Sequence, residues 1–354
     1  MDVEVIFSGL NPEQRCAVEA VRGPVCILAG AGSGKTTTIT RRIGNQVASG
    51  VFAADEILAV TFTDKAATEM RGRLEALGVA GVTVRTFHSA ALAQLHWFGQ
   101  APGRILPSKA LTLRRIANGL PPPYKFRPAG DLATEIEWAK NRRLTPDTYV
   151  DGLGDHEPPI PLDLMLRVFR FYEAEKSERG FVDFEDLLER TVRLLDEDEN
   201  ALAQVRARYH AFTVDEYQDV NLLQQTLLDR WLGERDELCA VGDDYQSIYA
   251  FTGATPRYLL GLPQRFPNAT VVRLEANYRS SPEVLELANR IVPVLGGAEK
   301  VLRAARESGP APTLKELATA EAEQSFVVEQ VRALHAAGVA YDEIAVLCRT
   351  NARL

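Results

Sequence analysis

The chain has 354 residues, of which 46% are hydrophobic and 25% charged, a composition typical of globular proteins with two or more domains. The net charge of −8 excludes a globally basic nucleic-acid-binding protein, although an acidic chain can still carry a local basic groove. We find neither a signal peptide nor an apolar run of membrane-spanning length, and therefore expect a cytoplasmic protein without a membrane partner.

A glycine-rich stretch, AGAGSGKT at residues 29–36, lies between an apolar run at 25–29 and an expected helix that begins TTTITRRI. Strand, glycine loop and helix in this order are the context of a phosphate-binding loop. The freed N–H groups at the helix start would bind a phosphate, Lys35 would reach the β- and γ-phosphates, and the Thr36 hydroxyl would ligate Mg²⁺. Ala29 replaces the first glycine of the usual pattern, and the alternative is a turn that binds nothing. Because strand, loop, Lys35 and Thr36 agree, we predict a nucleotide site.

An earlier helix is expected to begin at Asn11 and Pro12. The amide of Gln14 in this helix has a donor and an acceptor, which suits the edge of an adenine. Taken alone, an exposed helical glutamine with no ligand is the simpler interpretation.

Five further strand candidates follow the loop, and each has polar residues near its carboxyl end. They are residues 56–62, 82–87, 211–216, 237–242 and the segment from 270 that begins TVVRL. Open parallel α/β sheets bind ligands at that edge. Asp215 and Glu216 end one strand, where one acid would hold Mg²⁺ through water and the other would accept a proton from the attacking water. Gln246, after the next strand, would sense a γ-phosphate.

Other residues leave two interpretations open or indicate structure alone. Phe62 and Phe87 at strand ends are either core residues or stacking surfaces for unpaired bases. Residues 90–209 show helical spacing, interrupted by proline-rich segments, which predicts a mostly helical insertion with Asp183 as a helix cap. The four cysteines are far apart, and apolar surroundings predict buried free thiols at Cys26, Cys239 and Cys348.

Taken together, the motifs resemble those of the UvrD/Rep/PcrA group of superfamily I DNA helicases. The matching segments come in family order and cover residues 10–281, with a further match at 345–354; they are LNPEQ, AGAGSGKT, AVTFTDKAATEMR, RTFHS, VDFEDLL, VDEYQD, VGDDYQSIYAFTGA, LEANYRSS and AVLCRTNARL.

The resemblance implies an α/β fold: a P-loop NTPase (RecA-like) parallel sheet with a mostly helical inserted subdomain and a partial second RecA-like lobe. Residues 1–89 and 210–275 would form lobe 1A, residues 90–209 insertion 1B, and residues 276–354 an incomplete lobe 2A. It also implies an ATP- and Mg²⁺-dependent motor that moves 3′ to 5′ on single-stranded DNA in repair or replication.

The resemblance further implies a role for each matching residue. Lys35, Glu216, Gln246 and Arg279 would be catalytic, with Glu216 the base, Gln246 the γ-phosphate sensor and Arg279 an arginine finger. Thr36 and Asp215 would hold Mg²⁺. The ATP-binding residues would be Gln14, Ala31, Gly32, Ser33, Gly34, Lys35, Thr36, Thr37 and Tyr278. The single-strand track would include Phe62, Thr63, His88, Tyr249 and Phe251.

Two positions depart from the family pattern. Thr252 replaces an arginine, which affects a link between the nucleotide and DNA sites, and Thr37 replaces an arginine near the base, for which Arg41 or Arg42 are possible substitutes. The later helicase motifs are missing, so we expect a fragment of a longer helicase that binds ATP without coupled unwinding. Its least stable part would be residues 282–354, where TLKEL and IAVLC are strand candidates.

Two other functions remain as alternatives: the helicase subunit of a helicase–nuclease, and a non-motor module that binds ATP and DNA. A P-loop kinase or GTPase is disfavoured, because neither accounts for the aromatic residues or GDDYQS.

Overall fold

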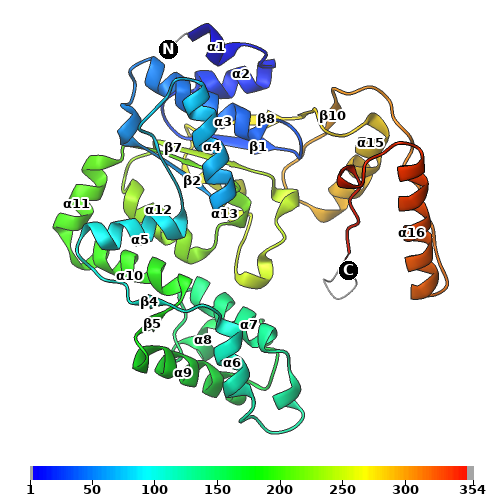
Figure 1. The fold of residues 1–354 in the computed structure, drawn as a ribbon. Coiled ribbons are helices and arrows are strands. Elements are labelled where there is room, and N and C mark those ends of the chain that lie inside the picture. The colour runs from blue at the N-terminus through cyan, green and yellow to red at the C-terminus, as the bar shows by residue number, and fades with distance from the viewer. Residues whose placement is uncertain (1–2, 349–354) are drawn as a thin grey trace. The chain divides into compact units, whose positions relative to one another are not determined.

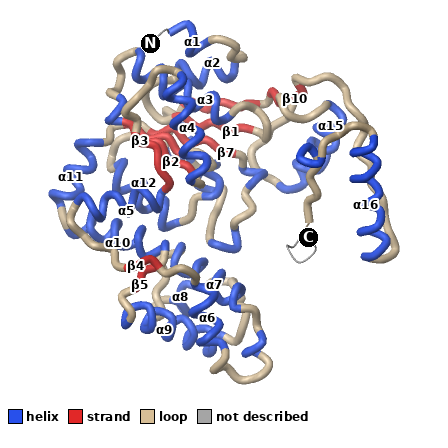
Figure 2. Tube along the Cα trace, viewed as in Figure 1, coloured by secondary structure: helices blue, strands red, loops and turns tan. Residues whose placement is uncertain are grey.

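The computed structural model describes residues 3–348, which divide into two compact units between Gly309 and Pro310. The first unit contains a central parallel sheet and most of the helices (Figures 1 and 2).

The sheet has six parallel strands in the order β3-β2-β6-β7-β1-β8. Their bounds are β1 Val25–Ala29, β2 Ile57–Thr61, β3 Thr83–Thr86, β6 Ala211–Val214, β7 Leu238–Gly242 and β8 Thr270–Leu274. All six strand candidates are therefore confirmed, with ends within two residues of those expected. Because every strand runs the same way, the polar residues that follow them meet at one edge of the sheet.

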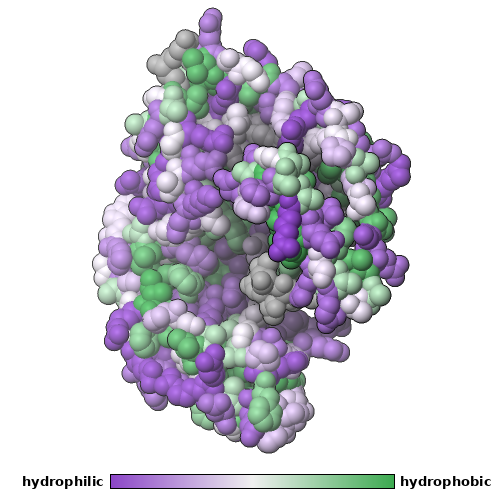
Figure 3. Space-filling view, turned by 45° about the vertical axis from the view of Figure 1, so that its right-hand side comes forward, coloured by the Kyte–Doolittle hydropathy of each residue, from purple (hydrophilic) through white to green (hydrophobic). Residues whose placement is uncertain are grey.

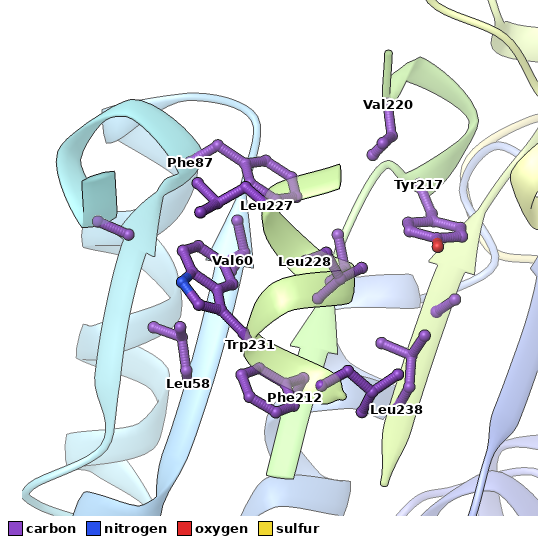
Figure 4. Close-up of a cluster of buried hydrophobic side chains, with 14 of the residues drawn as sticks. Leu58, Val60, Phe87, Phe212, Tyr217, Val220, Leu227, Leu228, Trp231 and Leu238 are labelled. Atoms are coloured by element: carbon purple, nitrogen blue, oxygen red, sulfur yellow. The ribbon is translucent and has the colours of Figure 1, made fainter. Parts of the chain in front are cut away.

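Alternate residues of each strand face opposite sides of the sheet, and each side has its own apolar core. On β1, Cys26 and Leu28 join one cluster, while Val25, Ile27 and Ala29 join the other. Figure 4 shows the first cluster, in which the ring of Trp231 stacks between Phe87 and Phe212, at centroid distances of 6.0 and 6.4 Å. Phe87 is therefore a core residue, and of its two interpretations packing is the correct one.

Helices cover both faces of the sheet (Figure 1). The first face carries α5 Phe87–Trp97, α10 Phe184–Glu197, α11 Glu199–Arg208, α12 Leu222–Leu232, α13 Arg257–Leu260 and α14 Leu262–Arg265. The second face carries α2 Pro12–Glu19, α3 Lys35–Ala48 and α4 Asp64–Ala76, and α1 Val3–Phe7 packs on α3. Short 3₁₀ turns are η1 Ala54–Glu56, η2 Tyr124–Phe126, η3 Tyr217–Asp219, η4 Asp244–Gln246, η5 Ala250–Thr252, η6 Val292–Leu295 and η7 Tyr341–Glu343.

The helical insertion has a hydrophobic core of its own, which runs from Leu113 to Tyr172. Its elements are β4 Arg104–Ile105, α6 Lys109–Ala117, α7 Ala129–Asn141, α8 Tyr149–Gly152, α9 Leu162–Glu178 and β5 Phe181–Val182. The predicted insertion, 90–209, also included α5, α10 and α11, and these helices pack against the sheet instead. Helical spacing identifies an apolar face but does not indicate which core that face joins.

A buried ionic network ties the insertion to α10. Asp183 caps α10, as predicted, and its carboxylate also lies 2.7 Å from Lys140 Nζ and 3.0 Å from Lys176 Nζ. Burial opposes the charge of Lys140, but Asp183, Asp186 and Glu173 outweigh it and raise the lysine's pKa. The same two lysines overcome the effect of burial on Asp183 and hold the carboxyl's pKa well below its ordinary value.

Replacing Lys140 with methionine is expected to destabilise the protein by about 3–5 kcal/mol, because buried carboxylates lose a partner. Urea unfolding at neutral pH measures the change, with Lys125→Met, an exposed lysine of the insertion, as control. Equal unfolding midpoints for the two variants would contradict the prediction.

The chain after the sheet forms few buried contacts. In the first unit, β9 Ala276–Asn277 pairs in parallel with β10 Arg303–Ala304, and α15 Pro282–Ile291 lies between them in sequence. The second unit contains α16 Ala320–Ala336, and none of its residues from 310 to 348 is buried. Among residues 3–348, no helix combines the length and apolarity needed to cross a bilayer. Hydrophilic and hydrophobic residues are interspersed on the face drawn in Figure 3.

Three sequence predictions for this region are wrong. TLKEL and the described residues of IAVLC form no strand, since no neighbouring strand among residues 3–348 pairs with them, and Leu314 and Leu347 are 100% and 95% exposed. An apolar run becomes a strand only where backbone partners are available. Cys348 is accordingly exposed, whereas Cys26 and Cys239 are buried free thiols as predicted.

Candidate active site

The glycine loop connects β1 to α3 in the expected order. Gly32 and Gly34 have φ angles of +68° and +83°, a conformation that favours glycine. A side chain on Gly32 would also come within 2.6 Å of the Arg279 side chain. Ser33 is buried, and its hydroxyl donates to the Gly30 carbonyl oxygen at 2.8 Å. The loop is thus shaped to present backbone N–H groups at the start of α3, as anion binding requires.

The lysine of this loop contacts the acidic pair after β6. Lys35 Nζ lies 2.9 Å from Glu216 Oε2, and the same oxygen accepts a 2.8 Å hydrogen bond from Gln218 Nε2. Glu216 has a φ of +51°, which is uncommon for a residue with a side chain and is typical of functional sites. The structure therefore brings Lys35 and Glu216, 181 positions apart in the sequence, into one site.

Asp215 lies beside this pair in a buried position. Burial and the neighbouring Glu216 raise the pKa of Asp215 to about 6. A divalent cation would offset both effects, and Asp215 with the Thr36 hydroxyl offers the oxygen ligands that Mg²⁺ prefers. The donor atoms of these residues therefore suit a magnesium ion, which Thr36 and Asp215 would hold.

Binding of Mg²⁺ and nucleotide is expected to weaken below pH 6, because a protonated Asp215 is a poor metal ligand. The affinity should fall by up to about tenfold for each pH unit below the carboxyl's pKa. Equilibrium titrations from pH 5 to pH 8 measure the effect. Asp215→Asn retains the titration of the nucleotide phosphates but loses that of the carboxyl, so parallel pH curves for the two proteins would contradict the assignment.

The expected base-binding residues lie next to the loop. Gln14 is buried, with 4% of its surface exposed, so the interpretation of an exposed helical glutamine is wrong. Its Nε2 donates to Ser33 O at 3.0 Å, and its Oε1 accepts from Asn11 N at 3.1 Å. The Tyr278 ring is 47% exposed, its backbone N–H donates to Gly32 O, and its hydroxyl accepts from Asn11 Nδ2. Helix α2 and the turn after β9 therefore hold Gln14 and Tyr278 against the glycine loop.

At position 37, where the family pattern has an arginine, the Thr37 side chain contacts an arginine from another helix. Arg41 donates to the carbonyl oxygens of Ile6 and Ser8, and Arg42 to that of Ala20. Arg73 of α4, by contrast, donates to Thr37 Oγ1 at 3.0 Å. Arg73 is thus the arginine that reaches the Thr37 side chain, and nothing in its local sequence distinguished it.

The predicted sensor and the predicted arginine finger are held by different contacts. Gln246 is exposed in η4, and its Nε2 donates to Asp243 Oδ2 at 2.7 Å. Arg279 is exposed in a turn organised by Asn277, whose side-chain oxygen accepts from Arg279 N and whose Nδ2 donates to Ala31 O. The turn that carries Arg279 is therefore bonded directly to the glycine loop.

The predicted DNA-binding aromatics form a connected series. The rings of Phe62 and Tyr249 stack at 5.3 Å, and Tyr249 and Phe251 lie 6.1 Å apart. Phe62 and Phe251 are 38% and 57% exposed. Thr63 caps α4 through its hydroxyl, so that side chain has a structural role. Exposed rings in series can stack on successive bases of a single strand.

His88 lies in a groove of about 450 Å³ between the sheet edge and the insertion, lined also by Phe62, Lys109, Phe184 and Thr252. Its ring packs edge-to-face on that of Phe184, a half-exposed residue that no sequence pattern marked as functional. Burial and Lys109 lower the pKa of His88 to about 4, so its imidazole is neutral near pH 7. It therefore offers an uncharged ring to a ligand in the groove.

Thr252, the other departure from the family pattern, is held by the insertion. Asn141 Nδ2, at the end of α7, donates to Thr252 O at 2.7 Å, and the Thr252 hydroxyl donates to Tyr249 O. The loop that carries Tyr249 and Phe251 is thus anchored to the insertion.

Family models match nearly the whole chain. The model of the UvrD/REP helicase N-terminal domain matches residues 10–267, and that of the UvrD-like helicase C-terminal domain matches residues 272–354. The chain belongs to the UvrD/REP helicase family. The parallel sheet of residues 3–348 agrees with the RecA-like lobes expected for this family.

The curated relatives that the chain matches are likewise named as DNA helicases. ATP-dependent DNA helicase UvrD2 of Mycobacterium tuberculosis H37Rv is 44% identical over 371 residues, which cover 98% of this chain and 53% of that protein. ATP-dependent DNA helicase PcrA of Bacillus subtilis is 33% identical over 364 residues, covering 98% of this chain and 48% of that protein. The chain spans about half the length of the curated relatives it matches.

Proposed function

We propose that this chain forms the ATP-hydrolysing part of a motor that moves 3′ to 5′ on single-stranded DNA during repair or replication. Lobe 1A consists of the six-stranded sheet with the helices packed on it, including α5, α10 and α11; insertion 1B consists of the elements from β4 to β5, and residues 276–354 are part of lobe 2A. The observation that carries the proposal is the contact between Lys35 Nζ and Glu216 Oε2. It joins a phosphate-binding lysine to a proton acceptor at the carboxyl edge of one sheet.

The geometry supports a separate role for each of these residues in ATP hydrolysis. Lys35 and the N–H groups of residues 31–37 bind the phosphates of ATP, while Gln14 and Tyr278 hold the base. Thr36 and Asp215 would hold Mg²⁺, which would supply positive charge to the phosphates. Glu216 accepts a proton from the attacking water, Gln246 contacts the γ-phosphate, and Arg279 stabilises charge in the transition state.

An incoming phosphate must compete with Glu216 for Lys35. Lys35 Nζ and Glu216 Oε2 form an ion pair, so a phosphate that binds Lys35 replaces Glu216 as its partner. Once Lys35 pairs with the nucleotide, the Glu216 carboxylate is free to orient water. Phosphate binding thereby prepares the base.

The DNA side of the proposal rests on the aromatic series Phe62–Tyr249–Phe251 and on His88 in the adjoining groove. Stacking on such rings tolerates any base, as a translocating motor requires.

The deciding experiment measures ATP binding and ATP turnover, each with and without single-stranded DNA, for wild type and Lys35→Ala. It uses this 354-residue chain and an extended protein, in which the unmatched remainder of its relative UvrD2 is fused after residue 354. We expect both wild-type proteins to bind ATP, the extended one to show DNA-stimulated turnover, and Lys35→Ala to lose both properties.

Failure of wild type to bind ATP, or equal turnover by Lys35→Ala, would contradict the proposal. ATP and DNA binding without turnover in both lengths would instead support the non-motor module. Additional cleavage of DNA by the extended protein would support the subunit of a helicase–nuclease.

A further inference from the structure

A continuous line of polar contacts runs beyond the catalytic pair. From Glu216 Oε2 it passes to Gln218, whose Nε2 donates to that oxygen at 2.8 Å. The Oε1 of Gln218 accepts from Asp243 N at 3.0 Å, and Asp243 Oδ1 lies 2.6 Å from Lys300 Nζ. The line therefore joins the ends of β6 and β7 to a segment 57 positions further along the chain.

Gln218 bridges Glu216 and Asp243 in this line of contacts. It is 1% exposed, and its amide supplies the donor that Glu216 needs and the acceptor that Asp243 N needs. Its Oε1 sits so close to Gly242 that any side chain there would lie 2.3 Å from it. The end of β7 is therefore built around this amide.

The two oxygens of the Asp243 carboxylate contact different side chains. One oxygen faces Lys300 Nζ, and the other accepts from Gln246 Nε2 at 2.7 Å. The position of Lys300 thus bears directly on the group that holds the predicted γ-phosphate sensor.

Lys300 is fixed more firmly than an ordinary lysine. Its side chain is 1% exposed, its Nζ also lies 2.6 Å from Asp244 Oδ1, and it sits 4.3 Å from the centre of the Tyr245 ring. Tyr245 Oη donates to Ala298 O, and Ala298 N donates to Asp244 Oδ2, both at 2.7 Å. Buried charges of this kind depend on their partners, so the segment 298–300 and η4 are held as one piece.

We propose that Gln218, Asp243 and Lys300 form a positioning relay that sets Glu216 and Gln246 for hydrolysis. This inference rests on the proposed function. The relay acts on the chemical step through Glu216 and Gln246, and it touches neither the base-binding residues nor Lys35 directly. Removing the Gln218 amide or the Lys300 charge therefore slows ATP turnover more than it weakens ATP binding.

The test compares Gln218→Leu and Lys300→Met with wild type in the extended protein, with DNA present. Each variant is expected to lower kcat by about 10- to 100-fold, as a small misplacement of reacting groups does, with the ATP Kd changed less than about threefold. Lys300→Arg, which keeps the charge, is expected to restore most of the turnover. The double variant should lose little more than either single variant, because both interrupt the same line.

Two matched controls separate positioning from general loss of packing. Gln225→Leu removes another buried glutamine, bonded to Tyr217 and Asp229, and Lys176→Met removes another buried, ion-paired lysine. Neither touches the relay, and both are expected to keep wild-type kcat at a temperature where circular dichroism shows folded protein.

Unchanged kcat in Gln218→Leu and Lys300→Met, or a loss confined to Kd, would overturn the relay while leaving the proposed function intact. Multiplicative losses in the double variant would also overturn it. Absence of turnover in the extended wild type would instead overturn the proposed function, and the relay with it.

Discussion

Glu216→Gln is expected to lower ATP turnover by about 10²–10⁴-fold, because the amide cannot accept a proton from the attacking water. ATP binding should be retained or become tighter. In the wild type, Glu216 Oε2 pairs with Lys35 Nζ at 2.9 Å, whereas a neutral amide leaves the full lysine charge to the phosphates. Steady-state turnover of the extended protein with single-stranded DNA measures the first effect, and equilibrium titration of either length with a fluorescent ATP analogue measures the second.

The matched control is Glu234→Gln, an exposed carboxylate after α12, which should behave as wild type. Turnover by Glu216→Gln within about threefold of wild type would mean that the proton is accepted elsewhere. The buried neighbour Asp219, whose pKa is raised to about 6 by burial and by Glu216, would then be the next carboxyl to replace.

The second large effect is expected at Arg279. Replacing it with alanine should lower kcat by about 10³–10⁵-fold if it acts as an arginine finger. Its backbone position is fixed by Asn277 and by the bond from Tyr278 N to Gly32 O, so the variant should keep the turn and lose only the guanidinium. Arg279→Lys should recover little, because an ammonium cannot make the paired contacts of a guanidinium.

The diagnostic measurement is binding of ADP with a metal fluoride that mimics the transferred phosphoryl group. Arg279→Ala should weaken this complex far more than it weakens the ATP complex, since a finger acts chiefly in the transition state. Arg290→Ala, on the exposed face of α15 and paired with Glu286, is the control. Equal weakening of both complexes by Arg279→Ala would assign the arginine to ground-state binding.

Sequence patterns indicated residues of the candidate site but not the contacts between them. Gln218 lies within the VDEYQD segment, yet no local pattern indicated that its amide would join Glu216 to Asp243. Gln14 was expected to be exposed on helical grounds, but Ser33 and Asn11 engage both ends of its amide. The contribution of Arg73 at Thr37 likewise depends on how α4 packs against α3.

The sequence by itself determined the features whose cause is local. A glycine loop after an apolar run, alternation along short strands and capping residues such as Asn11 and Asp183 act over a few positions. The strand–loop–helix order at the glycine loop, six strands and several helix starts could therefore be predicted.

Only the tertiary structure decided which distant groups meet. The strand order β6-β7-β1 brings Glu216 to Lys35, and the return of the chain after α15 places Lys300 between Asp243 and Asp244. TLKEL and IAVLC form no strands for the same reason, because no strand elsewhere in residues 3–348 pairs with them. A strand or a buried charge is stable only when a partner from elsewhere in the chain satisfies it, and that partner is not encoded in the local sequence.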